Sequence, residues 1–278
     1  MSAARASAVS AYYDRNTQAF LLQGRRDTGA IHRELWAPGV ATRPDALTHV
    51  NGLVAEHLPR QGGLLDLGCG VGGTAAWLTQ RNYGPIVGIT NSAVQARIGG
   101  DRIRAAGMEG RVAIRHGSYL QLAEAGVAAG SAAGAYAIES FIHSPDAAGF
   151  FRSAAQALRP GGTLVVCDDF LGPPARGRRP RAVLRRVATG WLATSLVSVA
   201  EAGRIAAAAG LTLRQTDELT QYHRYHGRLK RLWMHAVTAL PIPHPYWRSL
   251  RGGLALQIAL QRGWIRHALL VFGRSEAA

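Results

Sequence analysis

Residues 64–74, LLDLGCGVGGT, decide the fold of this chain. An apolar run ends at Asp66, glycines follow at positions 68, 70, 72 and 73, and an apolar helical pattern begins directly afterwards. This order predicts a buried parallel strand, a tight turn and a helix, because glycine permits positive φ and lets a ligand approach the backbone. The free N–H groups at the start of such a helix suit a carboxylate. Ligands bind beyond the carboxyl ends of parallel strands, so we expect a binding site at this turn.

The glycine spacing distinguishes two kinds of nucleotide site. Gly68, Gly70 and Gly73 satisfy the G-x-G-x-x-G pattern of dinucleotide-binding loops, which is a weak match on its own. Asp66 and the glycines at 68, 70 and 72 also satisfy acid-x-Gly-x-Gly-x-Gly, which resembles the first motif of class I S-adenosylmethionine (SAM) methyltransferases. By that resemblance Asp66, Gly68 and Gly70 would hold the methionine end of the cofactor. A structural turn without a ligand is the alternative.

The second strand, PIVGIT at residues 85–90, is expected beside the first because a short helix connects them. NAD sites usually end this strand with an acid for the ribose hydroxyls, and no acid stands here. The continuation ITNS with Gln95 one turn later is similar to the Gly-Ile-Thr-x-Ser-x-x-Gln run of the sterol and tocopherol methyltransferase branch. The resemblance assigns Thr90, Asn91 and Gln95 to the ribose region. Ser92 is expected to cap the following helix.

A third strand, residues 111–116, leads into Ser118 and Tyr119. Class I methyltransferases commonly place Gly-Asp here, with the Asp at the adenine amino group, so Ser118 departs from the pattern. A serine hydroxyl or a backbone N–H can still contact adenine. We therefore assign Ser118 and Tyr119 to the cofactor.

The chemistry is expected at the end of the fourth strand, AYAIESFIHSP at residues 135–145. This stretch resembles the Tyr-Ala-Ile-Glu-x-x-x-His-x-Pro signature of sterol C-methyltransferases, and its Glu-Ser pair is similar to an element of prenyl-diphosphate C-methyltransferases. Methyl transfer to an alkene creates a tertiary carbocation, which a carboxylate can stabilise and help to deprotonate. We predict that Glu139 and His143 are catalytic and that Phe141 contacts the substrate. The alternatives are Glu139 as a helix cap or loop acid and His143 as a structural residue.

The rest of the chain completes an α/β, Rossmann-like, doubly wound seven-stranded sheet. A fifth strand is expected over 161–168 after Pro160-Gly161, and Asp168 and Asp169 are interpreted as a plain loop pair rather than metal-linked acids. The order then continues with a helix at 200–209, a strand at 211–217, helices at about 221–240 and 245–262, and a strand at 265–272. The last strands would form an antiparallel hairpin.

Two additions to this sheet are predicted: an N-terminal helical cap, residues 1–60, and a lid of two helices, about 170–200, within the SAM-binding domain 61–278. The Tyr-Tyr-Asp opening at 12–14 and the His-containing segment before Trp36 resemble the cap of the sterol and tocopherol branch, which closes over cofactor and substrate. The resemblance places Tyr13 at the cofactor and Tyr12, His32 and Trp36 at the substrate. Packing of these aromatic residues in a core is the alternative.

The net charge of +15 is carried almost entirely by arginine, since Lys230 is the only lysine, and a compositional bias explains part of it. Six arginines lie within 176–186, on the predicted lid. Arginine forks suit phosphate oxygens, so Arg178 and Arg179 are assigned to the substrate. No RNA- or DNA-binding module accompanies the cluster, and no nucleic-acid partner is expected. Contact with an anionic membrane surface is an open alternative.

Cofactor, metal and compartment follow from the remaining features. Cys69 and Cys167 form neither a metal pair nor a disulfide framework, and no metal site is predicted; magnesium is expected only if the acceptor is a diphosphate. The first residues lack the apolar core of a secretory signal, so a cytoplasmic protein is expected. The oligomeric state stays open.

The sequence therefore predicts a SAM-dependent methyltransferase of a small molecule. The favoured acceptor is an isoprenoid alkene carbon, in a prenyl diphosphate or terpenoid, methylated through a carbocation that faces Glu139. One alternative is O-, N- or aromatic C-methylation of a natural-product scaffold. A catalytically inactive SAM-binding scaffold is the other.

Overall fold

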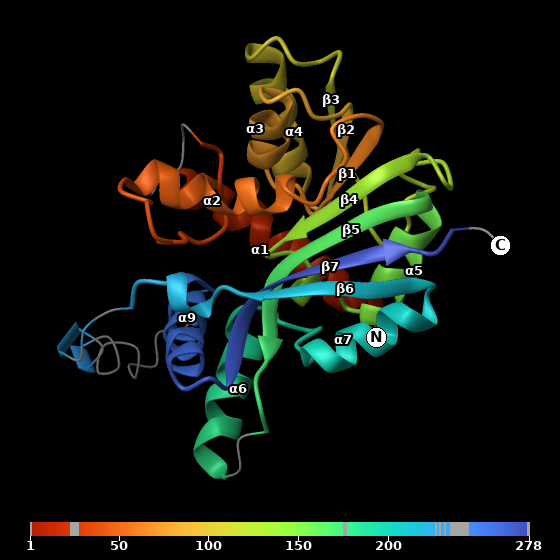
Figure 1. Cartoon of the computed structure of the whole chain (residues 1–278). Coiled ribbons are helices and arrows are strands. Elements are labelled where there is room, and N and C mark those ends of the chain that lie inside the picture. The colour runs from red at the N-terminus through yellow and green to blue at the C-terminus, as the bar shows by residue number, and fades with distance from the viewer. Residues whose placement is uncertain are drawn as a thin grey trace.

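The computed structural model describes residues 2–22, 28–174, 177–225, 227, 229–230, 232–233 and 245–276. Seven strands form one sheet in the order β3-β2-β1-β4-β5-β7-β6 (Figure 1). The strands β1 to β5 are parallel, whereas β7 runs antiparallel to both β5 and β6. The predicted doubly wound seven-stranded sheet with a final antiparallel hairpin is confirmed. Their bounds are β1 Gly63–Leu67, β2 Ile86–Thr90, β3 Val112–His116, β4 Ala132–Ile138, β5 Leu158–Leu171, β6 Leu211–Glu218 and β7 Ile265–Arg274.

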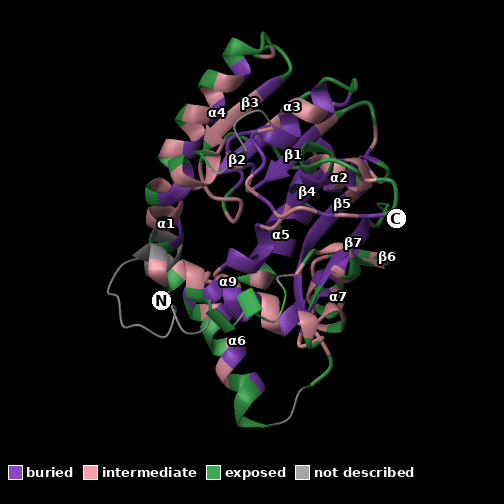
Figure 2. Ribbon diagram, turned by 90° about the vertical axis from the view of Figure 1, so that its left-hand side faces the viewer, coloured by how far each residue is buried: buried purple, intermediate pink, exposed green. Residues whose placement is uncertain are grey.

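Helices cover both faces of this sheet, because successive strand residues point to opposite sides. Leu64 of β1 packs in one core cluster with side chains of α2 (Arg43–Ala55), α3 (Gly73–Thr79) and α4 (Ala93–Ala105). Leu65 and Leu67 pack in the other cluster, with α5 (Ala147–Ala157) and α7 (Val199–Ala208). The central strands β1 and β4 between these layers are almost completely buried (Figure 2).

The ends of the helices follow local capping chemistry. The hydroxyl of Ser92 accepts a hydrogen bond from the Gln95 N–H and begins α4, as predicted from its position. Asp146 accepts from the Gly149 N–H and begins α5 in the same way. The two caps fix where α4 and α5 begin. They therefore fix the short connections from β2 and β4, at whose ends the candidate site residues lie.

Outside the central layers, the N-terminal helix α1 (Ser2–Leu22) packs against α4. Asp14 of α1 accepts hydrogen bonds from the Ser92 hydroxyl at 2.5 Å and from the Val94 N–H at 3.3 Å. At the other end of the molecule, α6 (Arg178–Gly190) packs against α9 (Pro245–Gln261) around Val187 and Leu256 (Figure 1).

The prediction of two helices in this lid is wrong, because the described residues of the segment hold one helix, α6, before α7 begins at Val199. The strand β5 continues to Leu171, and the chain after α6 is extended, with Leu171 bridging Ser198. The N–H groups of Thr194 and Ser195 both donate to the carbonyl of Ile142. Serine, threonine and β-branched residues dominate this stretch and favour such a backbone over a helix.

Two predictions fall largely outside the described residues. Of the helix expected at about 221–240, the structure shows a short 3₁₀ turn, η2 (Thr220–Tyr222), followed by irregular backbone to residue 225, and most of the remainder is not described. Arg176 of the arginine cluster is also outside the described residues. Within the described part of the chain, no helix has the length and apolar character needed to cross a bilayer.

Candidate active site

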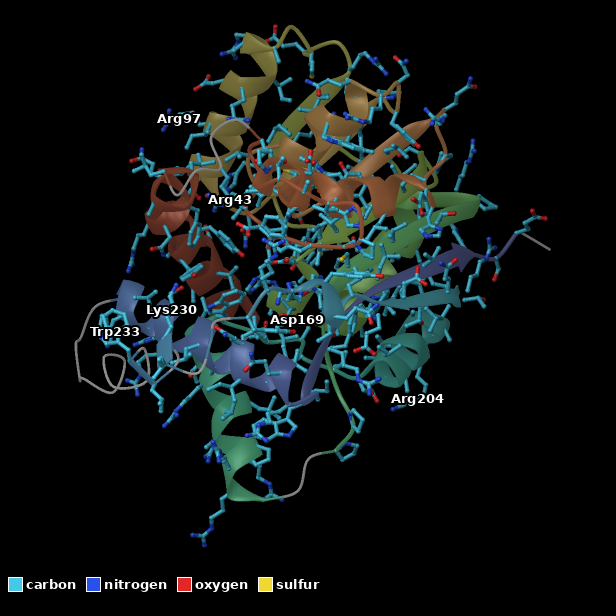
Figure 3. The ribbon with its side chains drawn as sticks, turned by 60° about the vertical axis from the view of Figure 1, so that its left-hand side comes forward. Arg43, Arg97, Asp169, Arg204, Lys230 and Trp233 are labelled. Atoms are coloured by element: carbon cyan, nitrogen blue, oxygen red, sulfur yellow. The ribbon has the colours of Figure 1, made fainter. Side chains whose placement is uncertain are left out.

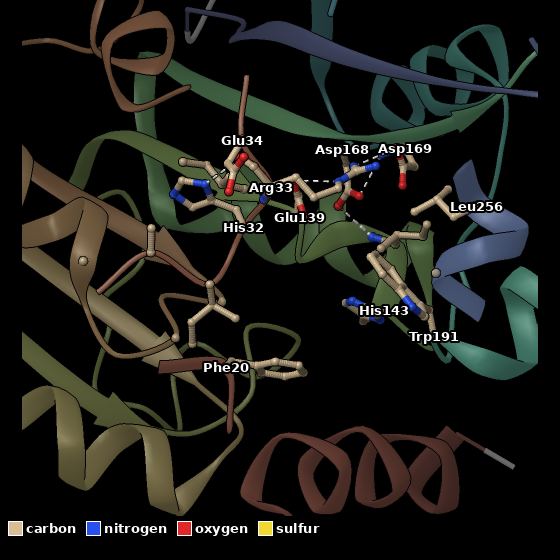
Figure 4. Close-up of a pocket in the computed structure, with 18 of the residues that line it drawn as sticks. Phe20, His32, Arg33, Glu34, Glu139, His143, Asp168, Asp169, Trp191 and Leu256 are labelled. Carbon is tan, nitrogen blue, oxygen red and sulfur yellow. Dashed lines mark hydrogen bonds and ion pairs between the residues drawn. The ribbon is translucent and has the colours of Figure 1, made fainter. Parts of the chain in front are cut away.

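A cavity of about 490 Å³ opens where the carboxyl ends of β1, β4 and β5 meet (Figure 4). Its walls come from the glycine loop after β1, from the ends of β4 and β5, from α1 and from α9. The remaining wall is a segment of residues 28–36, here called the strap, which crosses the cavity between α1 and α2.

The glycine loop takes the backbone form that its sequence predicts. Gly68, Gly70 and Gly72 all have positive φ, at 94°, 56° and 77°. The loop is hydrogen-bonded to β2, because the N–H groups of Gly68 and Cys69 both donate to the carbonyl of Ile89. A side chain at Gly68 would collide with Ser140, so the loop lies directly against the end of β4.

The strap lies on this loop at backbone contact distance. A Cβ built on Gly73 would lie 2.7 Å from backbone atoms of Thr28 and Gly29, and one on Gly70 would lie 3.3 Å from the Ile31 side chain. Because no side chain separates the two segments, the strap and the loop form one continuous surface of the cavity.

The site fits the cofactor that the glycine loop implies. Asp66 lines the cavity, and its Oδ2 atom is buried without a hydrogen-bond partner among the described residues. Burial raises the pKa of the Asp66 carboxyl to about 7, which makes a cationic ligand favourable beside it. The ammonium and sulfonium groups of SAM supply such charge, and the positive-φ glycines leave room for a ligand at the backbone.

The residues predicted to bind the cofactor divide into two groups. Asp66, Gly68, Gly70, Gln95 and Tyr13 line the cavity. Four others, Thr90, Asn91, Ser118 and Tyr119, are not among the described residues that line it. Thr90 is buried and donates to the Gln95 side-chain carbonyl at 2.8 Å, so it orients Gln95. The Tyr119 hydroxyl donates to the carbonyl of Ser140, and the Ser118 hydroxyl accepts from the Leu120 N–H.

The candidate catalytic acid, Glu139, is ion-paired with Arg33 of the strap. The backbone N–H and Nε–H of Arg33 both donate to Oε1 of Glu139 at 3.0 Å. Burial alone would raise the pKa of Glu139, but the charge and backbone N–H of Arg33, together with His267 and His32, outweigh burial and hold this pKa well below its usual value. Glu139 follows β4 directly and has a φ of 48°, uncommon for a residue with a side chain. It is therefore an ionised carboxylate whose charge is already paired.

Arg33 also joins the strap to β5 and β7. Its Nη2 donates to Oδ1 of Asp169 at 2.9 Å and lies 3.4 Å from Nδ1 of His267. His267 in turn lies 2.6 Å from Nε2 of His223 and 3.2 Å from Sγ of Cys167. Burial lowers the pKa values of both histidines, that of His223 to about 4. They are consequently neutral near pH 7.

The interpretation of Asp168 and Asp169 as a loop pair is wrong, because both lie inside β5 and are buried. The strand continues past them since β7 pairs with it through Leu171. Asp168 accepts hydrogen bonds from the backbone N–H groups of Ile142 and Asp169, and burial raises its pKa to about 8. Asp168 therefore anchors the turn that carries His143.

His143 lines the cavity and has one engaged nitrogen (Figure 4). Its Nδ1 lies 3.4 Å from the carbonyl of Leu192, and a carbonyl can only accept, so the proton is on Nδ1. Nε2 then carries a lone pair. Burial lowers the pKa of His143, which favours the neutral imidazole. The ring of Tyr13 packs edge-on against it.

The predicted substrate residues also divide. Tyr12, His32 and Trp36 line the cavity, and the Tyr12 hydroxyl is within hydrogen-bond distance of Ser249 on α9. Phe141 does not line it, because its ring is fully buried among Phe150, Phe151 and Phe170. Arg178 and Arg179 are exposed at the start of α6 and are also absent from the cavity wall. The assignments of Phe141, Arg178 and Arg179 to this cavity are therefore corrected.

Sequence reasoning missed Arg33, the residue with the most polar contacts in the site. It stands in the segment IHRELW, of which only His32 and Trp36 had been selected. A usable signal was present, since a basic residue in a segment expected to cover a pocket with an acid is a candidate ion-pair partner.

Known proteins are similar to this chain in sequence and in fold. A family described as a methyltransferase domain matches residues 41–216. The 27-O-demethylrifamycin SV methyltransferase of Amycolatopsis mediterranei is 32% identical over 197 residues, 70% of this chain and 71% of the relative. Methyltransferase GfsG of Streptomyces halstedii is 31% identical over 226 residues, 79% of this chain and 78% of the relative.

The fold also matches a solved C-methyltransferase. The geranyl diphosphate C-methyltransferase of Streptomyces coelicolor A3(2), in complex with Mg²⁺, geranyl-S-thiolodiphosphate and S-adenosyl-L-homocysteine, superposes with a TM-score of 0.76 at 17% identity, over 97% of this chain and 98% of that one. At this identity the likeness concerns the fold alone. The family match spans more than half of the chain and includes the glycine loop, β4 and β5, and the chain accordingly belongs to the SAM-dependent methyltransferases that carry this methyltransferase domain.

Proposed function

We propose that this methyltransferase transfers a methyl group from SAM to a hydroxyl oxygen of a small-molecule acceptor, with His143 as the general base. The single observation that carries the proposal is the position of His143, an imidazole in the cavity wall whose Nδ1 lies 3.4 Å from the Leu192 carbonyl. The 27-O-demethylrifamycin SV methyltransferase described above, whose name gives an oxygen position, supports a hydroxyl acceptor.

Five of the cavity residues are the ones that we propose for the cofactor. When bound, SAM supplies an electrophilic methyl group. The unpaired Oδ2 of Asp66 would accept hydrogen bonds from the ammonium group of the cofactor. Gly68 and Gly70 would allow the methionine portion to lie against the backbone, and Gln95, oriented by Thr90, would face the ribose. Tyr13 would close this end of the cavity from α1.

The base has a defined task in this reaction. A neutral alcohol is a weak nucleophile, and removal of its proton as the new O–C bond forms lowers the barrier. His143 would take that proton on Nε2, the hydroxyl oxygen would bond to the methyl carbon, and the carbon–sulfur bond would break to release S-adenosylhomocysteine. The lowered pKa of His143 keeps this nitrogen available near neutral pH.

Replacement of the base tests the proposal. His143→Ala should reduce kcat for hydroxyl acceptors by about 10²–10⁴, the usual contribution of a general base, and leave the affinity for S-adenosylhomocysteine unchanged. The half-buried His57 does not line the cavity, so His57→Ala is the matched control and should keep full activity. Methyl transfer can be followed with labelled SAM and a panel of hydroxylated natural products. A kcat within about three-fold of wild type in His143→Ala would rule out His143 as the base.

A second candidate is C-methylation of an isoprenoid alkene, and the aromatic lining of the cavity favours it. Aromatic faces stabilise cations, and six aromatic side chains line the cavity: Tyr12, Tyr13, Phe20, Trp36, Trp191 and Tyr225. The pairing of Glu139 with Arg33 counts against it, because the carboxylate that would stabilise the carbocation is already neutralised. Mass spectrometry of the product decides between a methyl ether and a new carbon–carbon bond. Magnesium would be needed only for a diphosphate acceptor.

A further inference from the structure

Arg33 has one hydrogen-bonding group that the protein leaves unused. Nε pairs with Glu139 and Nη2 pairs with Asp169, whereas Nη1 is buried and has no hydrogen-bond partner among the described residues. Arg33 lines the cavity, close to the end of β4 (Figure 4). A buried N–H group without an acceptor is unfavourable, so a ligand oxygen beside Nη1 would complete the site.

The charges around Arg33 decide what kind of oxygen this is. Glu139 and Asp169 each form an ion pair with the guanidinium of Arg33. Asp168 precedes Asp169 in β5. The described lining of the cavity holds only two arginines, and the second, Arg224, stacks on the Trp36 ring at 3.4 Å. The Arg33 guanidinium thus already faces two carboxylates, whereas Asp168, whose pKa burial raises to about 8, adds no negative charge near pH 7. There is no surplus positive charge for a phosphate or a carboxylate.

From this we infer that Arg33 binds the methyl acceptor through a neutral oxygen, a carbonyl or a second hydroxyl, and that the carboxylates of Glu139 and Asp169 exclude diphosphates and other anions. The inference rests on the proposed function, whose acceptor class it narrows. A neutral oxygen can accept from Nη1 without disturbing either ion pair, whereas an anion would meet Glu139 and Asp169 at the same place. Arg33 thus determines specificity for the methyl acceptor, and its ion pairs with Glu139 and Asp169 hold the guanidinium group in position.

The test uses the full-length enzyme, labelled SAM and matched acceptors that differ in charge, such as geraniol and geranyl diphosphate, together with neutral polyhydroxylated lactones and their phosphate esters. Transfer is expected to neutral acceptors. Arg33→Met should raise their KM by at least about ten-fold, as expected for loss of a hydrogen bond from a charged donor. The affinity for S-adenosylhomocysteine should change by less than about two-fold, because the hydrogen bonds of Arg33 in the described structure go to Glu139, Asp169 and His267.

Two further variants keep this test decisive if Arg33→Met folds poorly. Arg33→Lys retains the positive charge between Glu139 and Asp169 but lacks the second arm of the fork, so its KM should still rise. Arg204 is exposed on α7, remote from Asp169 in the core (Figure 3), and Arg204→Met should match wild type. A higher kcat/KM for geranyl diphosphate than for geraniol, or an unchanged KM in both Arg33 variants, would overturn the inference.

The outcomes also separate this inference from the proposed function. If His143→Ala abolishes transfer while both Arg33 variants keep the wild-type KM, hydroxyl methylation stands and the role of Arg33 is wrong. If the product carries a new carbon–carbon bond and the Arg33 variants still raise KM for neutral acceptors, the role of Arg33 stands and hydroxyl methylation is wrong.

Discussion

The ion pair with Arg33 changes the chemical role that Glu139 can have. Its position at the end of β4 and its left-handed φ hold the carboxylate at the cavity, as its motif predicts. The ion pair with Arg33 leaves little of its charge for a carbocation. In a hydroxyl methyltransferase, Glu139 would instead hold the strap and orient Arg33.

This difference gives a prediction for Glu139→Gln. The amide oxygen can still accept from the Arg33 backbone and Nε, so only the charge is lost. We expect kcat to fall by less than about ten-fold, whereas loss of a charge that stabilises a carbocation typically costs about 10²–10³. Single-turnover rates with labelled SAM measure the effect on the chemical step. A fall of 10² or more would favour the alkene acceptor.

At the scale of elements, the site is formed where the strap lies on the glycine loop. Gly73 begins α3, and its missing side chain lets the backbone at Thr28 and Gly29 reach the loop. The strap then continues through Arg33 to the ends of β4 and β5. The strap thus contacts the glycine loop at Gly73 and the two strand ends through Arg33.

The glycine contact can be tested by a single methyl group. Gly73→Ala should lower the free energy of unfolding by about 1–3 kcal/mol, as overpacking does, because the strap backbone 2.7 Å away must shift. It should also weaken S-adenosylhomocysteine binding, measured by calorimetry. Gly100 in α4 has open space at its Cβ position, so Gly100→Ala is the control and should stabilise the protein by about 0.5–1 kcal/mol. Equal behaviour of the two variants would mean that the strap does not need this contact.

For the whole molecule, buried titratable groups make stability depend on pH in two opposed ways. The pKa values of His143, His223 and His267 are lowered by burial, so their contribution is present above pH 6.5 and is lost as the pH falls below it. The pKa values of Asp66 and Asp168 are raised to about 7 and about 8. Their contribution is present at about pH 4 and is lost as the pH rises toward 8.

Asp168→Asn isolates the second effect. The variant is expected to be less stable at every pH, because an amide cannot accept both backbone hydrogen bonds that Asp168 accepts. The deficit should shrink between pH 5 and 8 by up to about 1.4 kcal/mol per pH unit, since only the wild type releases a proton from this position when it unfolds in this range. Urea unfolding across this range gives the slope. The exposed Asp101 provides a control, as Asp101→Asn should leave the slope unchanged, and a parallel slope in Asp168→Asn would show that Asp168 does not bind a proton in the folded protein.

Much of the fold could be predicted from local sequence because its causes are local. The apolar runs and the glycine loop each act within a few residues, and they correctly predicted seven strands and their order along the chain. The end of β4 likewise identified Glu139 and His143 as residues of the cavity wall. The same local signals failed where an element distant in sequence decides the structure. The last residues of β5 were predicted as a loop, but they are strand because β7 pairs with them.

The composition of the site was decided only by the tertiary structure. One hydrogen-bonded group joins Arg33 to Glu139, Asp169 and His267. Each of these three partners lies more than a hundred residues from Arg33 in the sequence. No periodicity or motif relates such positions, since their contacts arise when the strap crosses the ends of strands that the sheet has brought together. Burial then determines the protonation states of the group, and that burial comes from the whole chain rather than from any segment of it.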